Sequence, residues 1–231
     1  MKISKETLEI LKNFSQINSN LAVNEGNKIS TMTAHKHILA EAIVEENFPT
    51  FGIYDLPRFL GDISLFDEPE FSFKENHVLL KSGNRKSKIH FADEEFLVRP
   101  PKKSIKMPET TISFVLSQGD IDFIKKASAT LNLEDMSVKS DGKKVFLNIH
   151  DKEDDGSDEN SIEVAKSDGQ KYKLFFKVDN LRMLPSSYKV SIGFASNGKG
   201  ALSVFENQEI DLKYYIAVEA DSEIDEAPKQ A

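Results

Sequence analysis

The sequence predicts an α+β fold built mainly from antiparallel sheet, and three observations support this prediction. Many short segments of strand character are joined by polar turns, a spacing typical of antiparallel sheet rather than of alternating βαβ units. Four segments with helical spacing of apolar residues interrupt the strands. These four segments form two similar pairs, which indicates that the chain is a duplicated unit of helices and strands.

The four predicted helices occupy residues 4–17, 54–66, 117–131 and 179–184. Each of the two longer ones begins at a serine that can serve as N-cap, and each of the two shorter ones contains an aspartate that can do the same. Pro57 is compatible with a helix only because it falls in a first turn.

The strands are predicted between these helices. A hairpin is expected over residues 20–33, turning at Glu25-Gly26-Asn27, and two more turn at Ser82-Gly83-Asn84 and Ser140-Asp141-Gly142. The other predicted strands cover residues 38–44, 171–178, 188–194, 201–206 and 210–218.

The duplication is visible in aligned residues. Ile3-Ser4 and Leu8-Glu9-Ile10-Leu11-Lys12 correspond to Leu116-Ser117 and Ile121-Asp122-Phe123-Ile124-Lys125 at a constant offset of 113. Asp55-Leu56-Pro57-Arg58-Phe59-Leu60 corresponds to Asp179-Asn180-Leu181-Arg182-Met183-Leu184 at an offset of 124. We therefore expect one domain over residues 1–108, ending in a proline-rich basic connector at 99–108, and a second over residues 109–231.

Length, composition and charge exclude several classes. A chain of 231 residues with 39% hydrophobic and 29% charged residues is typical of a globular protein. The absence of cysteine excludes disulfide scaffolds, thiolate metal sites and cysteine nucleophiles, and fits a reducing compartment. We find no apolar run of membrane-spanning length and no signal-like N-terminus, so neither membrane insertion nor export is expected.

Two acidic segments account for the net charge of −8. Residues 151–159 and 219–226 each carry −5, which leaves +2 for the rest of the chain. The folded body is therefore expected to be nearly neutral. The tail over residues 221–231 is expected to be partly disordered, because it contains one large apolar residue, Ile224.

No motif indicates a metal, a cofactor or catalysis. His35 and His37 would share one face of a strand, but a solvated turn is the better interpretation because no further ligands lie nearby. Residues 151–156 resemble the start of a calcium-binding loop, yet Ile162 stands where the bidentate glutamate should be. We interpret this segment as a solvated acidic hairpin loop.

Basic residues on the predicted helices are the remaining candidates for a binding site. Lys125 repeats Lys12, and Arg182 repeats Arg58, at equivalent positions of the duplicated unit. Such residues are usually only a solvated face, but their repetition favours one shared anionic partner, and a phosphate backbone is the natural one. The candidate DNA-facing residues are Lys5, Lys12, Arg58, Lys125, Lys126 and Arg182.

At these residues the sequence resembles the DNA polymerase sliding clamps of T-even-type bacteriophages. The matching stretches run in order along the chain: Met1-Lys2-Ile3-Ser4-Lys5, Leu11-Lys12-Asn13-Phe14, Ile17-Asn18-Ser19, Ile53-Tyr54-Asp55-Leu56, Phe59-Leu60-Gly61, Pro185 with Tyr188-Lys189, and Glu219-Ala220-Asp221-Ser222. Residues 67–115 and 151–163 show little resemblance.

The resemblance implies a DNA-clamp fold of two similar α+β domains, each with two helices packed on antiparallel sheet. It implies a non-catalytic processivity factor without cofactors, in which three chains close head-to-tail around double-stranded DNA and tether the replicative DNA polymerase. An ATP-using clamp loader would open this homotrimer in the cytoplasm of the infected bacterial host, and transcription factors of late transcription would be further partners. A partner peptide would dock between the domains, for which we select Ile105, Met107, Tyr215 and Val218 as the apolar wall.

Two interpretations of other classes stay open at this point. One is a small-molecule enzyme on an all-β scaffold, which predicts a monomer or dimer with a deep polar pocket. The other is a non-catalytic β-rich phage structural or interaction protein, which predicts open-ended assembly. The mass of the particle in solution discriminates among the three.

Overall fold

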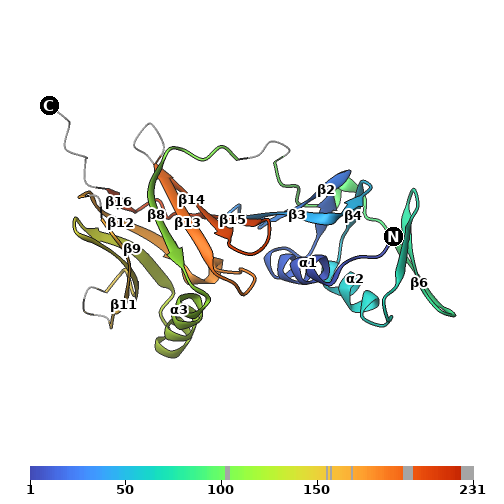
Figure 1. The fold of residues 1–231 in the computed structure, drawn as a ribbon, viewed down its shortest axis with the longest axis horizontal. Helices are drawn as coiled ribbons and strands as arrows, with labels where there is room; N and C mark the ends of the chain where they lie inside the picture. The colour runs from blue at the N-terminus through green and yellow to red at the C-terminus, as the bar shows by residue number, and fades with distance from the viewer. Residues whose placement is uncertain (102–104, 155, 157, 168, 195–199, 225–231) are drawn as a thin grey trace. The chain divides into compact units, whose positions relative to one another are not determined.

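The computed structural model describes residues 1–101, 105–154, 156, 158–167, 169–194 and 200–224 (Figure 1). The chain divides into two compact units. The first unit contains Met1–Ile105 together with Arg182–Leu184 and Asp211–Tyr214, and the second contains Lys106–Leu181, Pro185–Ile210 and Tyr215–Ala231. The predicted α+β class with antiparallel sheets is confirmed.

Two helices of the first unit form as their caps predict. In α1 (Lys5–Ile17) the N-cap Ser4 side chain accepts a hydrogen bond from Thr7 N, and the apolar stripe of the helix is buried. In α2 (Leu56–Ile63) the N-cap Asp55 accepts from Arg58 N, and proline occupies the first turn. The two helices pack side by side (Figure 1).

The strands at the start of the first unit correct one prediction. They are β1 (Leu21–Val23), β2 (Gly26–Met32), β3 (Ile38–Phe48) and β4 (Phe51–Ile53). The expected hairpin over residues 20–33 does not form: β1 pairs with β4, and β2 pairs with β3. Leu21, Val23 and both ends of β4 are buried, whereas the start of β2 is not, so burial of two short apolar strands outweighs the local turn signal.

A three-stranded meander completes the first unit. It contains β5 (Glu70–Phe73), β6 (His77–Ser82) and β7 (Arg85–His90), and its second hairpin turns at Gly83 as predicted. Met1 exchanges two backbone hydrogen bonds with Phe71 and so covers the outer edge of β5. A short 3-10 helix, η1 (Glu94–Phe96), follows. Within the described residues, β7 is therefore the uncovered edge of this sheet.

The second unit begins with β8 (Thr110–Leu116) and α3 (Gln118–Leu131). Its five-stranded antiparallel sheet has the order β11 (Asn160–Lys166), β10 (Lys144–His150), β9 (Asp135–Asp141), β12 (Lys171–Lys177) and β16 (Glu223–Ile224). A second group pairs β8 with β13 (Tyr188–Phe194) and β13 with β14 (Ala201–Asn207). The last long strand, β15 (Leu212–Ala217), has its first residues in the first unit and the rest in the second.

The fourth predicted helix is not present. Residues 179–184 contain only the end of a 3-10 turn, η2 (Val178–Asn180), and its side chains make no capping hydrogen bond. Leu184 precedes Pro185, which disfavours helical backbone there. In addition, Arg182–Leu184 belong to the first unit, whereas the residues before them, up to Leu181, belong to the second.

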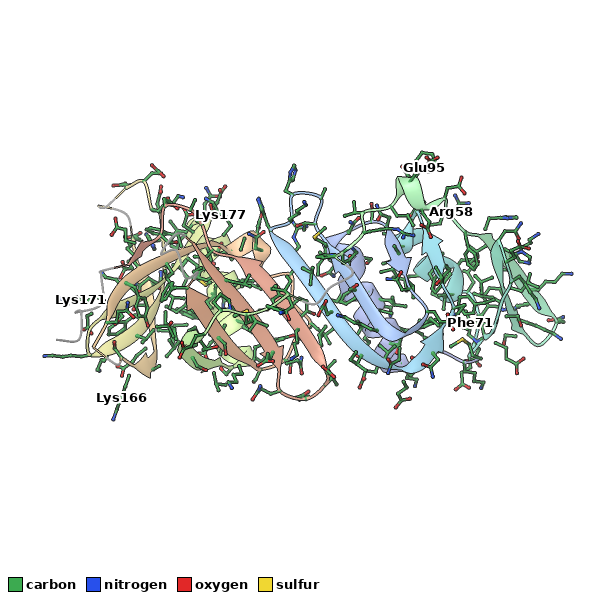
Figure 2. All side chains as sticks on the ribbon, turned by 90° about the horizontal axis from the view of Figure 1, so that it is seen from above. Arg58, Phe71, Glu95, Lys166, Lys171 and Lys177 are labelled. Atoms are coloured by element: carbon green, nitrogen blue, oxygen red, sulfur yellow. The ribbon has the colours of Figure 1, made fainter. Side chains whose placement is uncertain are left out.

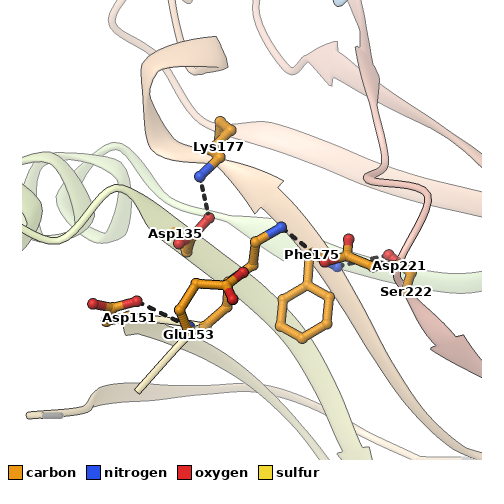
Figure 3. Close-up of polar contacts among 8 residues, drawn as sticks. Asp135, Asp151, Glu153, Phe175, Lys177, Asp221 and Ser222 are labelled. Atoms are coloured by element: carbon orange, nitrogen blue, oxygen red, sulfur yellow. Dashed lines mark hydrogen bonds and ion pairs between the residues drawn. The ribbon is translucent and has the colours of Figure 1, made fainter. Parts of the chain in front are cut away.

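The acidic loop and the acidic tail are held together on the second unit (Figure 3). Lys152 Nζ lies 2.8 Å from Asp221 Oδ2, and Phe175 N donates to Ser222 Oγ at 2.9 Å. Glu219 N donates to the carbonyl of Phe175, and β16 pairs with Tyr172 and Lys173 of β12. The part of the predicted disordered tail at residues 221–224 is therefore packed on the sheet, while residues 225–231 lie outside the described residues.

Candidate nucleic-acid interface

A buried carboxylate fixes the start of α1. Glu46 of β3 is buried and accepts hydrogen bonds from Thr7 Oγ1 at 2.6 Å and from Ser4 N. Burial alone would raise the pKa of Glu46, but these hydrogen bonds together outweigh it and hold the pKa below its ordinary value. The ionised group therefore satisfies donors at the positive end of the helix dipole.

Two of the candidate DNA-facing residues lie on α1. Lys5 and Lys12 are both exposed, and their spacing of seven residues places them on one face of α1. The opposite face buries Ile10, Leu11 and Phe14. The two ammonium groups consequently point away from the core of the first unit.

In the second unit, α3 repeats this arrangement. Ser117 and Asp120 form a capping box, and Ile121 and Ile124 are buried. Lys125 and Lys126 are exposed on the other side. Although much of its side chain is exposed, protein atoms around the Lys125 ammonium lower its pKa by desolvation, and the Asp122 carboxylate acts in the opposite direction.

The caps show how closely the two helices correspond. Ser4 and Ser117 both cap their helices, and Lys12 and Lys125 both stand eight residues further on, exposed. The predicted equivalence of these two lysines therefore holds at the level of helix position within each unit.

The two arginines do not correspond in this way. Arg58 lies on α2 and is exposed (Figure 2). Arg182 does not lie on a helix: its Nη1 donates to Gln16 O at 3.0 Å, and its own carbonyl accepts from Asn13 Nδ2 at 3.1 Å. Arg182 thus satisfies a carbonyl at the C-terminus of α1, so its predicted equivalence with Arg58 is wrong.

The four residues predicted to form the peptide pocket belong to both units. Ile105 lies in the first unit, Met107, Tyr215 and Val218 lie in the second, and each is half-buried. Their role as a peptide pocket stays a prediction. The rings of His35 and His37 have centroids 6.0 Å apart.

The described residues contain neither a cluster of metal-ligating side chains nor a membrane-spanning helix. Within that part of the chain, no three His, Cys, Asp or Glu side chains gather closely enough to hold a metal ion. No helix there is long and apolar enough to cross a membrane.

Sequence reasoning missed one cavity of mixed charge. It has a volume of about 750 Å³ and opens between α2 and β7, and its lining includes Arg58, Lys88 and His90 together with Asp55 and Asp62. The alternation of Lys86, Lys88 and His90 in the sequence indicates one basic face of a strand, because alternate residues of a strand share a face. It does not indicate the cavity, which also needs β7 to lie against α2.

Comparison with known proteins decides the family. The family model described as "gp45 sliding clamp, C terminal" matches residues 113–220. The sliding clamp of Vibrio phage KVP40 is 32% identical over 228 residues, which cover 95% of this chain and 100% of that protein. This chain belongs to the sliding clamp family. The sliding clamp of Enterobacteria phage T4 is 28% identical, covering 96% of this chain and 98% of its own.

The fold is shared more widely than the sequence. A solved structure described as "C-terminal region of FEN-1 bound to A. fulgidus PCNA" superposes with a TM-score of 0.67 at 15% identity, covering 96% of this clamp and 98% of that chain. This confirms the predicted DNA-clamp fold. Sliding clamps are non-catalytic processivity factors of DNA replication that act with DNA and a polymerase. The enzyme and structural-protein interpretations are therefore set aside.

Proposed function

We propose that three copies of this clamp close head-to-tail into a ring that encircles duplex DNA, with Lys12 and Lys125 facing the phosphates. The observation that supports this most directly is the equivalence of these lysines on two helices that both begin at a serine N-cap, one in each unit. A trimer would present six such positions. Residues 1–108 and 109–231 would then act as its duplicated modules, with Lys5, Arg58 and Lys126 beside the same DNA.

Two edge strands, one in each unit, could pair between copies and close the ring. Among the described residues, β7 is the uncovered edge strand of its sheet in the first unit, and β11 ends the five-stranded sheet of the second. Pairing β7 of one copy with β11 of the next would remove both edges, which are otherwise sites of aggregation. Because the two surfaces differ, the contact is heterologous, and such contacts form a closed ring when the rotation between copies permits it.

A topologically linked ring needs no base contacts. It raises the local concentration of the polymerase at the primer end, which is the physical origin of processivity.

We further propose that an ATP-using clamp loader opens the ring in the host cytoplasm and that late-transcription factors bind the clamp. Partner peptides would dock at the apolar residues Ile105, Met107, Tyr215 and Val218. The solved PCNA relative carries a bound FEN-1 segment, which supports docking of peptides on this fold.

The test combines particle mass with polymerase activity. Sedimentation equilibrium should give three times the monomer mass at micromolar concentration. Addition of the clamp with its loader and ATP should lengthen the products of the cognate phage polymerase on long primed templates. A monomer that leaves product length unchanged would contradict the proposal.

A further inference from the structure

An acidic segment near the end of the chain lies along the outer edge of β12. Residues 219–224, which we call the tail segment, include β16, and β16 pairs with β12 near its start. Further along the strand, Phe175 N donates to Ser222 Oγ (Figure 3), and Glu219 N donates to the carbonyl of Phe175. The tail segment therefore adds a short strand to one edge of the five-stranded sheet.

The edge that the tail segment covers is basic around an aromatic ring. Lys173 and Lys177 alternate along β12, so they share the face of the strand that also carries Phe175. Lys152 Nζ and Lys173 Nζ lie 5.7 and 4.9 Å from the centroid of the Phe175 ring, within the range of cation–π attraction. Lys177 pairs with Asp135. Lys152 and Lys173 therefore supply the positive charge beside the ring.

The tail segment supplies negative charge that matches these lysines. Its acidic residues alternate, at Glu219, Asp221 and Glu223. Asp221 Oδ2 lies 2.8 Å from Lys152 Nζ, and this hydrogen bond lowers the pKa of Asp221 and raises the pKa of Lys152. Glu223 lies directly opposite Lys173 in the strand register. The edge of β12 is thus suited to an extended backbone with carboxylates at alternate positions.

The contacts of the tail segment are of a kind that a competing segment can replace. β16 is two residues long, and so short a pairing is marginal on its own. The Asp221 side chain is 52% exposed, and exposed ion pairs contribute little to stability. Release of the tail segment would uncover the backbone N–H and carbonyl of Phe175. An uncovered strand edge is a template for pairing with another chain.

We propose that the outer edge of β12 is a docking site for an extended acidic segment of a partner protein, and that the tail segment occupies this site until the partner displaces it. The partner would add a strand to the sheet, with main-chain hydrogen bonds for affinity and a carboxylate on Lys152 for specificity. Because Glu219 follows the end of β15 at Ala217 by two residues, the tail segment competes at high local concentration. This docking depends neither on the proposed ring nor on the proposed apolar peptide pocket.

A peptide added in trans tests this docking. The probe is a fluorescently labelled peptide with the sequence of residues 218–224, and fluorescence anisotropy measures its binding. Asp221→Ala with Ser222→Ala removes the ion pair and the hydroxyl acceptor of the tail segment, so this double variant should bind the probe about tenfold more tightly than the unchanged chain. Adding Lys152→Glu should abolish this gain. Adding Lys189→Glu, the same charge change at an exposed residue of β13, should preserve it.

A disulfide tests the same competition in a chain that keeps Asp221 and Ser222. Lys173 and Glu223 lie directly opposite each other, and the chain has no cysteine of its own, so Lys173→Cys with Glu223→Cys can be crosslinked across the strand edge. The reduced form should bind the probe at millimolar concentration, and the oxidised form should not. This comparison decides the question even if the double variant fails to fold.

Several results would overturn the proposal. They are a folded double variant that binds the probe no better than the unchanged chain, a reduced disulfide variant that binds no probe, and an oxidised one that still binds it. A probe with lysine at its acidic positions that binds equally well would also contradict it. Single-stranded DNA that displaces the probe as effectively as unlabelled peptide would show a general anion-binding surface in place of a peptide site.

Discussion

Thr7 of α1 donates its hydroxyl hydrogen bond to the buried carboxylate of Glu46 on β3, at 2.6 Å. The same carboxylate accepts from Ser4 N, so one strand residue closes the first turn of the helix. The direction of α1, and with it that of Lys5 and Lys12, therefore depends on a residue about 40 positions further along the chain.

Replacing Glu46 tests this dependence. Glu46→Gln should lower the free energy of unfolding at pH 7 by about 1–3 kcal/mol, because the variant removes a charged acceptor from the buried Thr7 hydroxyl and the half-buried Ser4 N–H. The folded-state pKa of Glu46 is lowered, so its contribution is present above the unfolded pKa of about 4.3 and is lost as pH falls through the folded pKa. Urea unfolding at pH 7 and at pH 3 should thus show a smaller pH dependence in the variant. Glu45→Gln, at an exposed neighbour, is the control.

Reversing the equivalent lysines tests the DNA-facing surface. Lys12→Glu with Lys125→Glu should leave trimer mass and melting nearly unchanged, since exposed substitutions usually change stability by under about 0.5 kcal/mol. Processivity should fall, most clearly as salt rises. The salt slope of DNA binding should also become shallower, by roughly 0.9 for each phosphate that the variant no longer neutralises.

The matched control for this pair reverses Lys139 and Lys171, which are exposed on β9 and β12 of the second unit (Figure 2 labels Lys171). An equal fall in processivity in the control would contradict the assignment of α1 and α3 as the DNA-facing helices.

Replacing Tyr214 tests how much the contacts between α1 and residues from the second half of the chain stabilise the protein. Its hydroxyl donates to Asn13 Oδ1 at 2.7 Å and accepts from Leu184 N at 3.0 Å. Tyr214→Phe should cost about 1–3 kcal/mol of unfolding free energy, because it removes the hydroxyl that pairs with the Asn13 side chain and with the backbone N–H of Leu184. Chemical denaturation measures this, and a change below about 0.5 kcal/mol would show that these groups find other partners.

Truncation of the tail separates its packed part from the rest. Removing residues 225–231 should leave trimer mass and melting unchanged. Removing residues 219–231 also deletes Glu219 and Ser222, which hydrogen-bond to the Phe175 backbone, and Asp221, which pairs with Lys152, and should lower the melting temperature by several degrees. Thermal unfolding followed by circular dichroism compares the two. Equal melting would show that the packed segment adds no stability.

The helices with explicit caps could be predicted from the sequence, because Ser4, Asp55 and Ser117 act through neighbours only three residues away. The false hairpin at residues 20–33 and the false helix at 179–184 have the opposite cause. There the structure depends on residues distant in sequence: Val23 pairs with Phe51, and Arg182 hydrogen-bonds to Gln16, so the local pattern does not decide the structure.

Several strands were also missed by the sequence reasoning. Among them β8 shows alternating burial over Thr110–Leu116, so its pattern was readable, whereas the four-residue β5 has too little pattern to recognise. For the candidate site, the exposed lysines followed from local position. The cavity beside Arg58 did not, because it needs β7 to be placed against α2.

The first unit is not one continuous stretch of chain, since it takes Arg182–Leu184 and Asp211–Tyr214 from near the other end. During synthesis, the ribosome therefore releases α1 long before Tyr214 exists to satisfy Asn13. The N-terminal half of the nascent chain therefore has an incomplete core until the C-terminal residues are synthesised. Contacts between residues about 200 positions apart also form late and slowly. We expect this chain to fold after release rather than module by module, and an isolated fragment of residues 1–105 to be prone to aggregation.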